Sequence, residues 1–148
     1  MRMAVTEEQM ATLRAQLAGD LEEHKRLLAQ LDRAAARTGY SALLSAAFCV
    51  AVERRFAKGT PAADVIEFVG DVRSRFDELA NKIDPRTAER LILAVYTDEH
   101  VPDELDLETR FRTQLLLLGA LIADENLDDA GLDEFLAHAR KLADQWLA

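Results

Sequence analysis

Residues 40–56 read YSALLSAAFCVAVERRF, and this stretch decides the fold. Between Ala42 and Val52 the only polar side chain is Ser45, so a helix here is apolar on every face for three turns. A helix of that kind has to lie inside a protein. We therefore predict a central helix at about residues 40–57, with the other helices wrapped around it.

The composition favours helices along the whole chain. Only three of the 148 residues are proline and six are glycine, while 49% are hydrophobic and 30% charged, as in ordinary globular domains. A second apolar run, QLLLLGALIA, predicts another buried central helix at about residues 106–123. We expect an all-α fold: a single compact bundle of about six helices, forming one domain over residues 1–148, with residues 1–5 as a flexible N-terminus.

The first predicted helix carries the longest amphipathic stripe. Thr6 and Gln9 fit a capping box at its start, and apolar residues then recur in steps of three and four as far as residue 35. Gly19 and Asp20 could end the helix, since Asp20 suits a second N-terminus. Because the stripe keeps its phase across this pair, we expect one helix of about 45 Å, with a fold-back at Gly19 as the alternative.

A helix of that length would extend past the rest of the molecule, whose radius of gyration should be about 15 Å. An exposed apolar stripe usually marks an interface, and two-fold dimers are the commonest oligomers. We therefore expect a homodimer. Four residues of the stripe are the candidate dimer face: Met10, Leu13, Leu17 and Leu21.

Other boundaries are indicated by glycine, proline and aspartate. Gly39 is expected to be a left-handed C-cap, and the central helix should stop at Gly59. Asp84 and Asp128 are expected to cap the N-termini of the helices that follow them. Gly70 lies inside a predicted helix, where glycine costs about 1 kcal/mol relative to alanine, so we expect a close crossing there.

The net charge of −9 arises entirely in the last third of the chain. Residues 1–97 carry 14 Lys+Arg and 14 Asp+Glu, whereas residues 98–148 carry 4 and 13. This excess argues against nucleic-acid binding, which needs clustered cations. It permits either a solvated acidic surface or a docking face for a basic protein partner. The candidate partner-binding residues are Asp98, Glu99, Asp103, Glu104, Asp106, Asp124, Glu125, Asp128 and Asp129.

Residues 124–128 resemble the start of an EF-hand calcium loop, with oxygen-bearing side chains at positions one, three and five. That loop needs glycine at position six and a carboxylate at position twelve. Those positions are Asp129 and Phe135 here, and phenylalanine cannot bind calcium. The sequence therefore predicts an acidic helix-capping turn, with no metal site and no cofactor.

Isolated histidine and cysteine residues have structural interpretations. His24 lies on the apolar stripe and is expected at the rim of a packed face. Cys49 lies within the central helix, where a free cysteine behaves as a small hydrophobe. No phosphate-binding loop, nucleophile elbow or zinc-binding motif occurs, so no catalytic residue is predicted.

These features lead to expectations about location and function. No apolar run reaches the roughly 20 residues that span a bilayer, the N-terminus lacks a signal-peptide core, and the single cysteine allows no internal disulfide. We expect a cytoplasmic protein, and 14 arginines against 4 lysines are typical of a GC-rich bacterial genome. Its function is expected to be non-catalytic and to rest on protein contacts, self-association first. The alternative is a small-molecule-binding bundle, or an enzyme without a short motif, with a pocket between the central and fifth helices.

Overall fold

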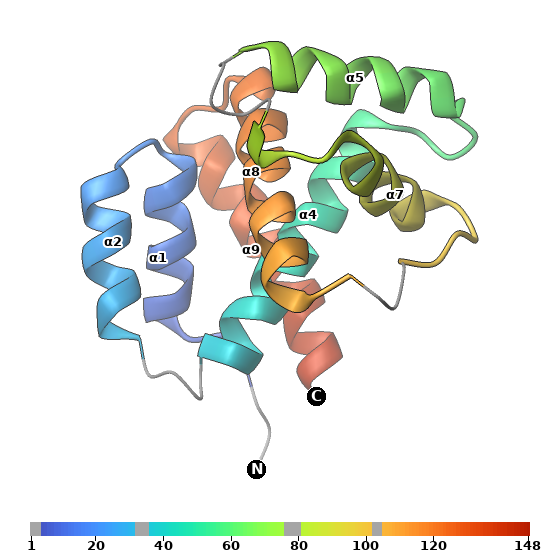
Figure 1. Cartoon of the computed structure of the whole chain (residues 1–148). Helices are drawn as coiled ribbons and strands as arrows, with labels where there is room; N and C mark the ends of the chain where they lie inside the picture. The colour runs from blue at the N-terminus through green and yellow to red at the C-terminus, as the bar shows by residue number, and fades with distance from the viewer. Residues whose placement is uncertain (1–3, 32–35, 76–80, 102–104) are drawn as a thin grey trace. The chain divides into compact units, whose positions relative to one another are not determined.

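The computed structural model describes residues 4–31, 36–75, 81–101 and 105–148. Within these ranges the chain forms seven α-helices and one short π-helical segment, with no strand (Figure 1). The all-α class predicted from the sequence is confirmed. The described part of the chain has no helix that combines the length and the apolar character needed to cross a membrane.

Two compact units make up the chain. Unit 1 comprises Met1–Val50 together with Ile122–Ala148, and unit 2 comprises Ala51–Leu121. Both boundaries fall within helices, α4 (Ser41–Arg55) and α8 (Leu107–Glu125), so each of these helices contributes residues to both units. The expectation of a single domain stays a prediction.

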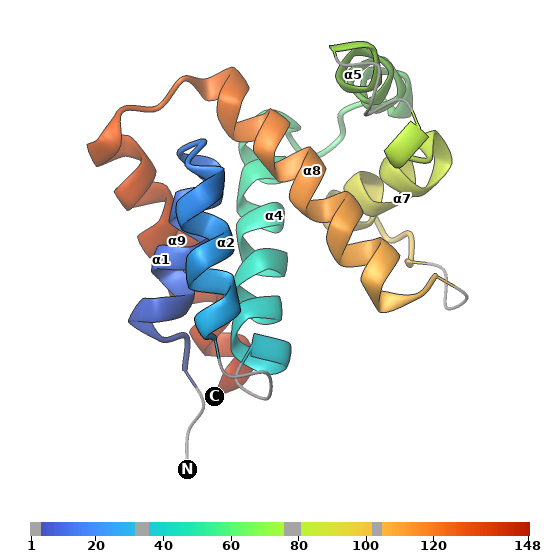
Figure 2. The same ribbon diagram turned by 60° about the vertical axis from the view of Figure 1, so that its left-hand side comes forward.

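The first predicted helix is in fact two helices. In unit 1, α1 (Glu7–Leu17) and α2 (Leu21–Gln30) lie side by side (Figures 1 and 2). Gly19 has a φ of 84°, which glycine adopts without strain, and Asp20 caps α2 by accepting a 3.2 Å hydrogen bond from the backbone N–H of Glu23. The single long helix is therefore wrong, because this turn chemistry outweighs the unbroken phase of the stripe.

A buried histidine joins the two helices. His24 is the one buried residue of α2, and its Nδ1 lies 2.8 Å from the carbonyl oxygen of Thr12 in α1. A carbonyl oxygen only accepts, so Nδ1 carries the proton in this bond. Thr12 is itself fully buried. His24 thus lies within the helix contact, further inside than the rim position expected from the sequence.

Gly39 allows a close approach between α1 and the π-helical segment η1 (Ala36–Tyr40). It lacks the left-handed conformation expected of a C-cap, since the described glycines with positive φ are Gly19 and Gly59. A Cβ atom at position 39 would instead lie 2.5 Å from Oε1 of Gln9. Gln9 is 2% exposed, and the same Oε1 accepts a bond from the backbone N–H of Thr6 in the predicted capping box.

The central helix is buried around most of its circumference, as predicted. Its three exposed residues, at positions 53–55, all lie in its last turn. Cys49 is half-buried. The buried residues of α4 are Leu43, Leu44, Ala46, Ala47, Phe48, Val50, Ala51 and Val52.

The other predicted buried helix is α8. It begins at Leu107, one residue after the expected start, and ends at Glu125, two residues after the expected end. Its buried residues are Thr113, Gln114, Leu117, Leu118, Leu121 and Ile122. α9 (Asp129–Leu147) follows, and Asp128 caps it as predicted, accepting a 2.7 Å bond from the N–H of Gly131. Trp146 is 51% exposed, because it lies in the last turn of α9, beyond the last buried residue of the helix, Ala143.

In unit 2, α5 (Ala62–Arg75) packs against α7 (Pro85–Tyr96). Asp84 caps α7 as predicted, and the hydrogen bonds from Thr87 hold the pKa of its carboxyl below the ordinary value. The close crossing expected at Gly70 is wrong. This glycine is exposed, and a Cβ there would meet nothing within 4 Å.

Candidate functional site

The predicted acidic residues fall into both units. Asp98, Glu99 and Asp106 belong to unit 2, whereas those at 124, 125, 128 and 129 belong to unit 1. Asp103 and Glu104 lie outside the described residues. The predicted partner-binding residues therefore form two acidic groups, one in each unit.

Two of these acids have a local structural task. Asp106 accepts a 2.7 Å bond from the backbone N–H of Thr109, and a second bond of 3.0 Å from its hydroxyl. These bonds lower the pKa of the Asp106 carboxyl. Asp128 caps α9 in the same manner. Carboxylates at helix N-termini are explained by unpaired backbone N–H groups and the helix dipole.

Further acids of unit 1 contribute to an ion-pair group between α1 and α9. The guanidinium of Arg14 lies 2.7 Å from Asp133 and 3.6 Å from Asp129. The side chain of Asp129 is 98% exposed. Exposed pairs of this kind are worth at most about 1 kcal/mol, so they orient α9 more than they stabilise it.

The turn at residues 124–128 has the geometry of a helix end. Asn126 has a φ of 52°, a left-handed conformation that asparagine tolerates better than most residues. Its backbone N–H bonds to the carbonyl of Ala123. Across the described ranges, no three His, Cys, Asp or Glu side chains are grouped so that they could hold a metal ion.

The four residues predicted to form a dimer face do not share one exposed surface. Leu13 is fully buried, Met10 and Leu17 are half-buried, and Leu21 is 54% exposed. The fold-back at Gly19 separates the first three from Leu21. The homodimer itself stays a prediction, but the protruding helix that motivated it does not exist.

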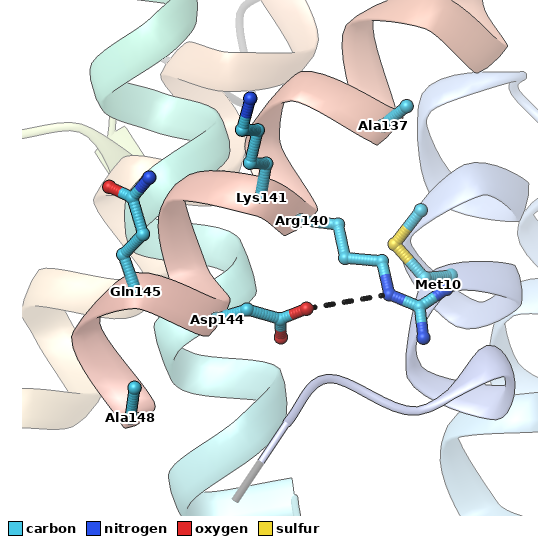
Figure 3. Close-up of a pocket in the computed structure, with 7 residues that line it drawn as sticks. All are labelled: Met10, Ala137, Arg140, Lys141, Asp144, Gln145 and Ala148. Carbon is cyan, nitrogen blue, oxygen red and sulfur yellow. Dashed lines mark ion pairs between the residues drawn. The ribbon is translucent and has the colours of Figure 1, made fainter.

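A groove in unit 1 runs between α1 and the last turns of α9 (Figure 3). Its volume is about 580 Å³. Figure 3 shows Met10 on α1 and the other lining side chains on α9, with a dashed line joining Arg140 to Asp144. The lining residues are Met10, Ala137, Arg140, Lys141, Asp144, Gln145 and Ala148.

Two charged groups of this groove, Arg140 and Asp144, bind other parts of the chain itself. Arg140 bonds to the carbonyl of Val5 at 2.9 Å and pairs with Glu7 at 2.5 Å. Asp144 accepts a 2.8 Å bond from the backbone N–H of Val5. We call this set of contacts the terminal clasp. Arg140 and Asp144 are therefore both engaged by the clasp, whereas Lys141 and Gln145 line the groove without contributing to it.

A second pocket, of about 510 Å³, lies in unit 2 at the ends of α4 and α7. Its floor is aromatic: Phe56 and Tyr96 are stacked with ring centroids 6.3 Å apart and an interplanar angle of 13°. Phe68 meets Phe56 edge-on at 5.5 Å. We call it the aromatic pocket. Its lining residues are Glu53, Phe56, Lys58, Val95, Tyr96, Thr97 and Asp98.

The surroundings of Tyr96 are apolar and negative. Its hydroxyl donates a 3.1 Å hydrogen bond to the carbonyl of Thr60, which fixes the ring. The pKa of Tyr96 is raised, first by burial and then by the charges of Asp64 and Glu99. Asp98, one of the predicted partner-binding residues, lines the same pocket. The aromatic pair itself was not predicted, because nothing in the sequence pairs residues 40 positions apart.

Comparisons with models of known protein families, with curated proteins and with solved structures found no match for this chain. The two pockets and the exposed helix faces are therefore interpreted from their own geometry. The aromatic pocket carries three charged side chains in its lining, Glu53, Lys58 and Asp98, and none of them takes part in the terminal clasp.

Proposed function

We propose that this protein is non-catalytic and acts through protein contacts, of which self-association is the first. The exposed side of α2 supports the proposal. Leu21 and Leu28 are 54% and 43% exposed, and their seven-residue spacing places them on one side of the helix. Large apolar side chains exposed on one side of a helix favour coverage by another protein surface.

The proposed face replaces the stripe expected from the sequence. It keeps Leu21, omits Met10, Leu13 and Leu17 of α1, and adds Leu28. A second copy of the chain is the simplest partner, since a two-fold axis would bring two such faces together. The exposed leucines are few, and association also costs translational and rotational freedom. We therefore expect a weak dimer, with dissociation in the micromolar range or above.

Light scattering from micromolar to millimolar protein tests this proposal. A dimer should raise the particle mass above 16.5 kDa with concentration, and Leu21→Glu/Leu28→Glu should return it to the monomer. Ile66→Glu is the matched control, because Ile66 is 53% exposed on α5 and lies outside the proposed face. A mass that stays at the monomer value contradicts self-association, and an equal effect of the control contradicts the face.

A basic protein is the second proposed partner, and unit 2 offers the better docking position. Asp98 and Glu99 are exposed directly after α7, whereas Asp106 and Asp128 are occupied as N-caps. Charges of this kind speed association more than they deepen affinity. Binding of a labelled oligolysine peptide should therefore be slower for Asp98→Asn/Glu99→Gln than for the equally charged control Glu67→Gln/Glu134→Gln. Equal rates would contradict docking at α7.

A further inference from the structure

We propose that the aromatic pocket of unit 2 binds a small organic cation: an ammonium or guanidinium group attached to an apolar body. The pocket's volume of about 510 Å³ falls within the range of about 300–1,000 Å³ found for small-molecule sites. The inference does not depend on self-association, which concerns α2 in unit 1.

The pocket has a rigid apolar floor. Phe56 is 1% exposed and is held between its stacking contact with Tyr96 and its edge contact with Phe68. The Tyr96 ring is held in turn by its hydrogen bond to Thr60. Because these rings are already ordered in the free protein, a ligand would not have to immobilise them on binding.

The same aromatic cluster already accommodates a cation. The guanidinium carbon of Arg55 lies 5.0 Å from the ring centroid of Phe56 and 5.6 Å from that of Phe68. Both distances are within the roughly 6 Å over which a ring face attracts a cation. Tyr96 is half-buried and lines the pocket, so it can offer the same kind of surface to a ligand.

The charges around the pocket favour a cationic ligand over an anionic one. Glu53 and Asp98 contribute exposed carboxylates to the lining, against the single ammonium of Lys58. Asp64 and Glu99 are close enough to act on the Tyr96 phenol. Two carboxylates therefore line the pocket and two more act on the Tyr96 phenol, while Arg55 is held against the two phenylalanines. A carboxylate or phosphate ligand would be repelled, and a cation would be attracted.

The volume indicates a free small molecule rather than a side chain of a protein partner. A single lysine or arginine side chain would leave much of the pocket unfilled, whereas a cation with an aromatic or branched apolar body would fill it and cover the exposed part of Tyr96. We therefore assign the site to a small ligand whose charge lies at the rim and whose apolar part lies against Tyr96.

Three probes that share one ring test the charge preference: benzylamine, benzyl alcohol and benzoate. They differ in charge (positive, neutral and negative at neutral pH) and little in size. Titration of the whole protein, followed by NMR chemical shifts of the Tyr96 and Asp98 amides, should show benzylamine binding about tenfold more tightly than benzyl alcohol, and benzoate binding least. Equal affinities for the amine and the alcohol would overturn the proposal.

Variants locate the binding. Glu53→Gln and Asp98→Asn lie on the exposed rim, so they should leave the fold intact; each should weaken benzylamine binding several-fold and leave benzyl alcohol unchanged. Tyr96→Leu should weaken both probes. Glu67→Gln removes one charge from α5 outside the lining and should change neither. If Glu67→Gln weakens benzylamine binding as much as Asp98→Asn does, the effect is only that of net charge and the proposed site is wrong.

A competition experiment tests the kind of occupant. A short arginine–glycine peptide that competes better than benzylamine would indicate a protein side chain as the occupant and would also overturn the proposal.

Discussion

α2 and α4 are both helices that contain leucines, yet the structure treats them in opposite ways. α4 is buried around most of its circumference, whereas α2 buries one residue, His24, and leaves Leu21 and Leu28 exposed. α4 is fixed by packing, and α2 by a hydrogen bond and an N-cap. Segments with few buried apolar contacts open at the lowest free energy. We therefore expect α4 to carry the stability of unit 1 and α2 to be available for contacts with other molecules.

The strongest test of this contrast is Phe48→Ala in α4. Phe48 is 1% exposed, and emptying a phenylalanine site in a core costs about 3–5 kcal/mol. That loss is a large part of the roughly 5–15 kcal/mol that stabilises a typical domain. Chemical denaturation should show a much lower midpoint, and a midpoint close to that of the wild type would mean that α4 is not central.

A smaller loss is expected from Gly39→Ala, where α1 meets the start of the central helix. The new Cβ would lie 2.5 Å from Oε1 and 2.6 Å from Nε2 of Gln9. Gln9 would have to move and give up its bond to Thr6, so overpacking of about 1–3 kcal/mol is expected. The double variant Gln9→Ala/Gly39→Ala should recover part of this loss in a double-mutant cycle. Simple additivity of the two changes would show that the contact is not the cause.

His24→Ala should loosen α2 and leave α4 in place. The change removes the hydrogen bond that His24 donates to the buried carbonyl of Thr12, at a cost of about 1–2 kcal/mol. Amide hydrogen exchange should accelerate in α2 more than in α4. Equal acceleration in both helices would mean that they unfold together, and the contrast between them would fail.

The smallest effect on stability is expected from Leu28→Ser. Leu28 is 43% exposed, and substitutions at exposed positions usually change stability by less than about 0.5 kcal/mol. The unfolding midpoint measured on dilute protein should therefore stay close to that of the wild type. A clear loss would show that Leu28 already packs within its own chain, which would remove it from the proposed dimer face.

Much of the fold follows from local signals in the sequence. The capping box of Thr6 and Gln9, and the N-caps at Asp84 and Asp128, depend on residues three positions apart, so a sequence pattern can reveal them. The burial of α4 follows from its composition. The break at Gly19 was predicted wrongly because two local signals conflicted, the phase of the apolar stripe and the turn-forming pair.

Features that depend on distant residues could not be predicted. Gly39 was noticed as a turn residue, but its actual neighbour is Gln9, thirty positions earlier in the chain. Asp98 was predicted as a partner-binding residue from its charge alone, without the rings of Tyr96 and Phe56 that line the same pocket. Charge can be read from composition, whereas a pocket exists only once α4 and α7 have packed within unit 2.

The terminal clasp has a consequence for the order in which the chain can fold during synthesis. It bonds Val5 to Arg140 and Asp144, so α1 has to wait for almost the entire chain before these contacts can form. Unit 2 is continuous in sequence and leaves the ribosome before residues 122–148 do. We therefore expect nascent chains halted after residue 121, once extruded, to resist proteolysis first within residues 51–121. Residues 4–31 should become protected only when α9 has emerged.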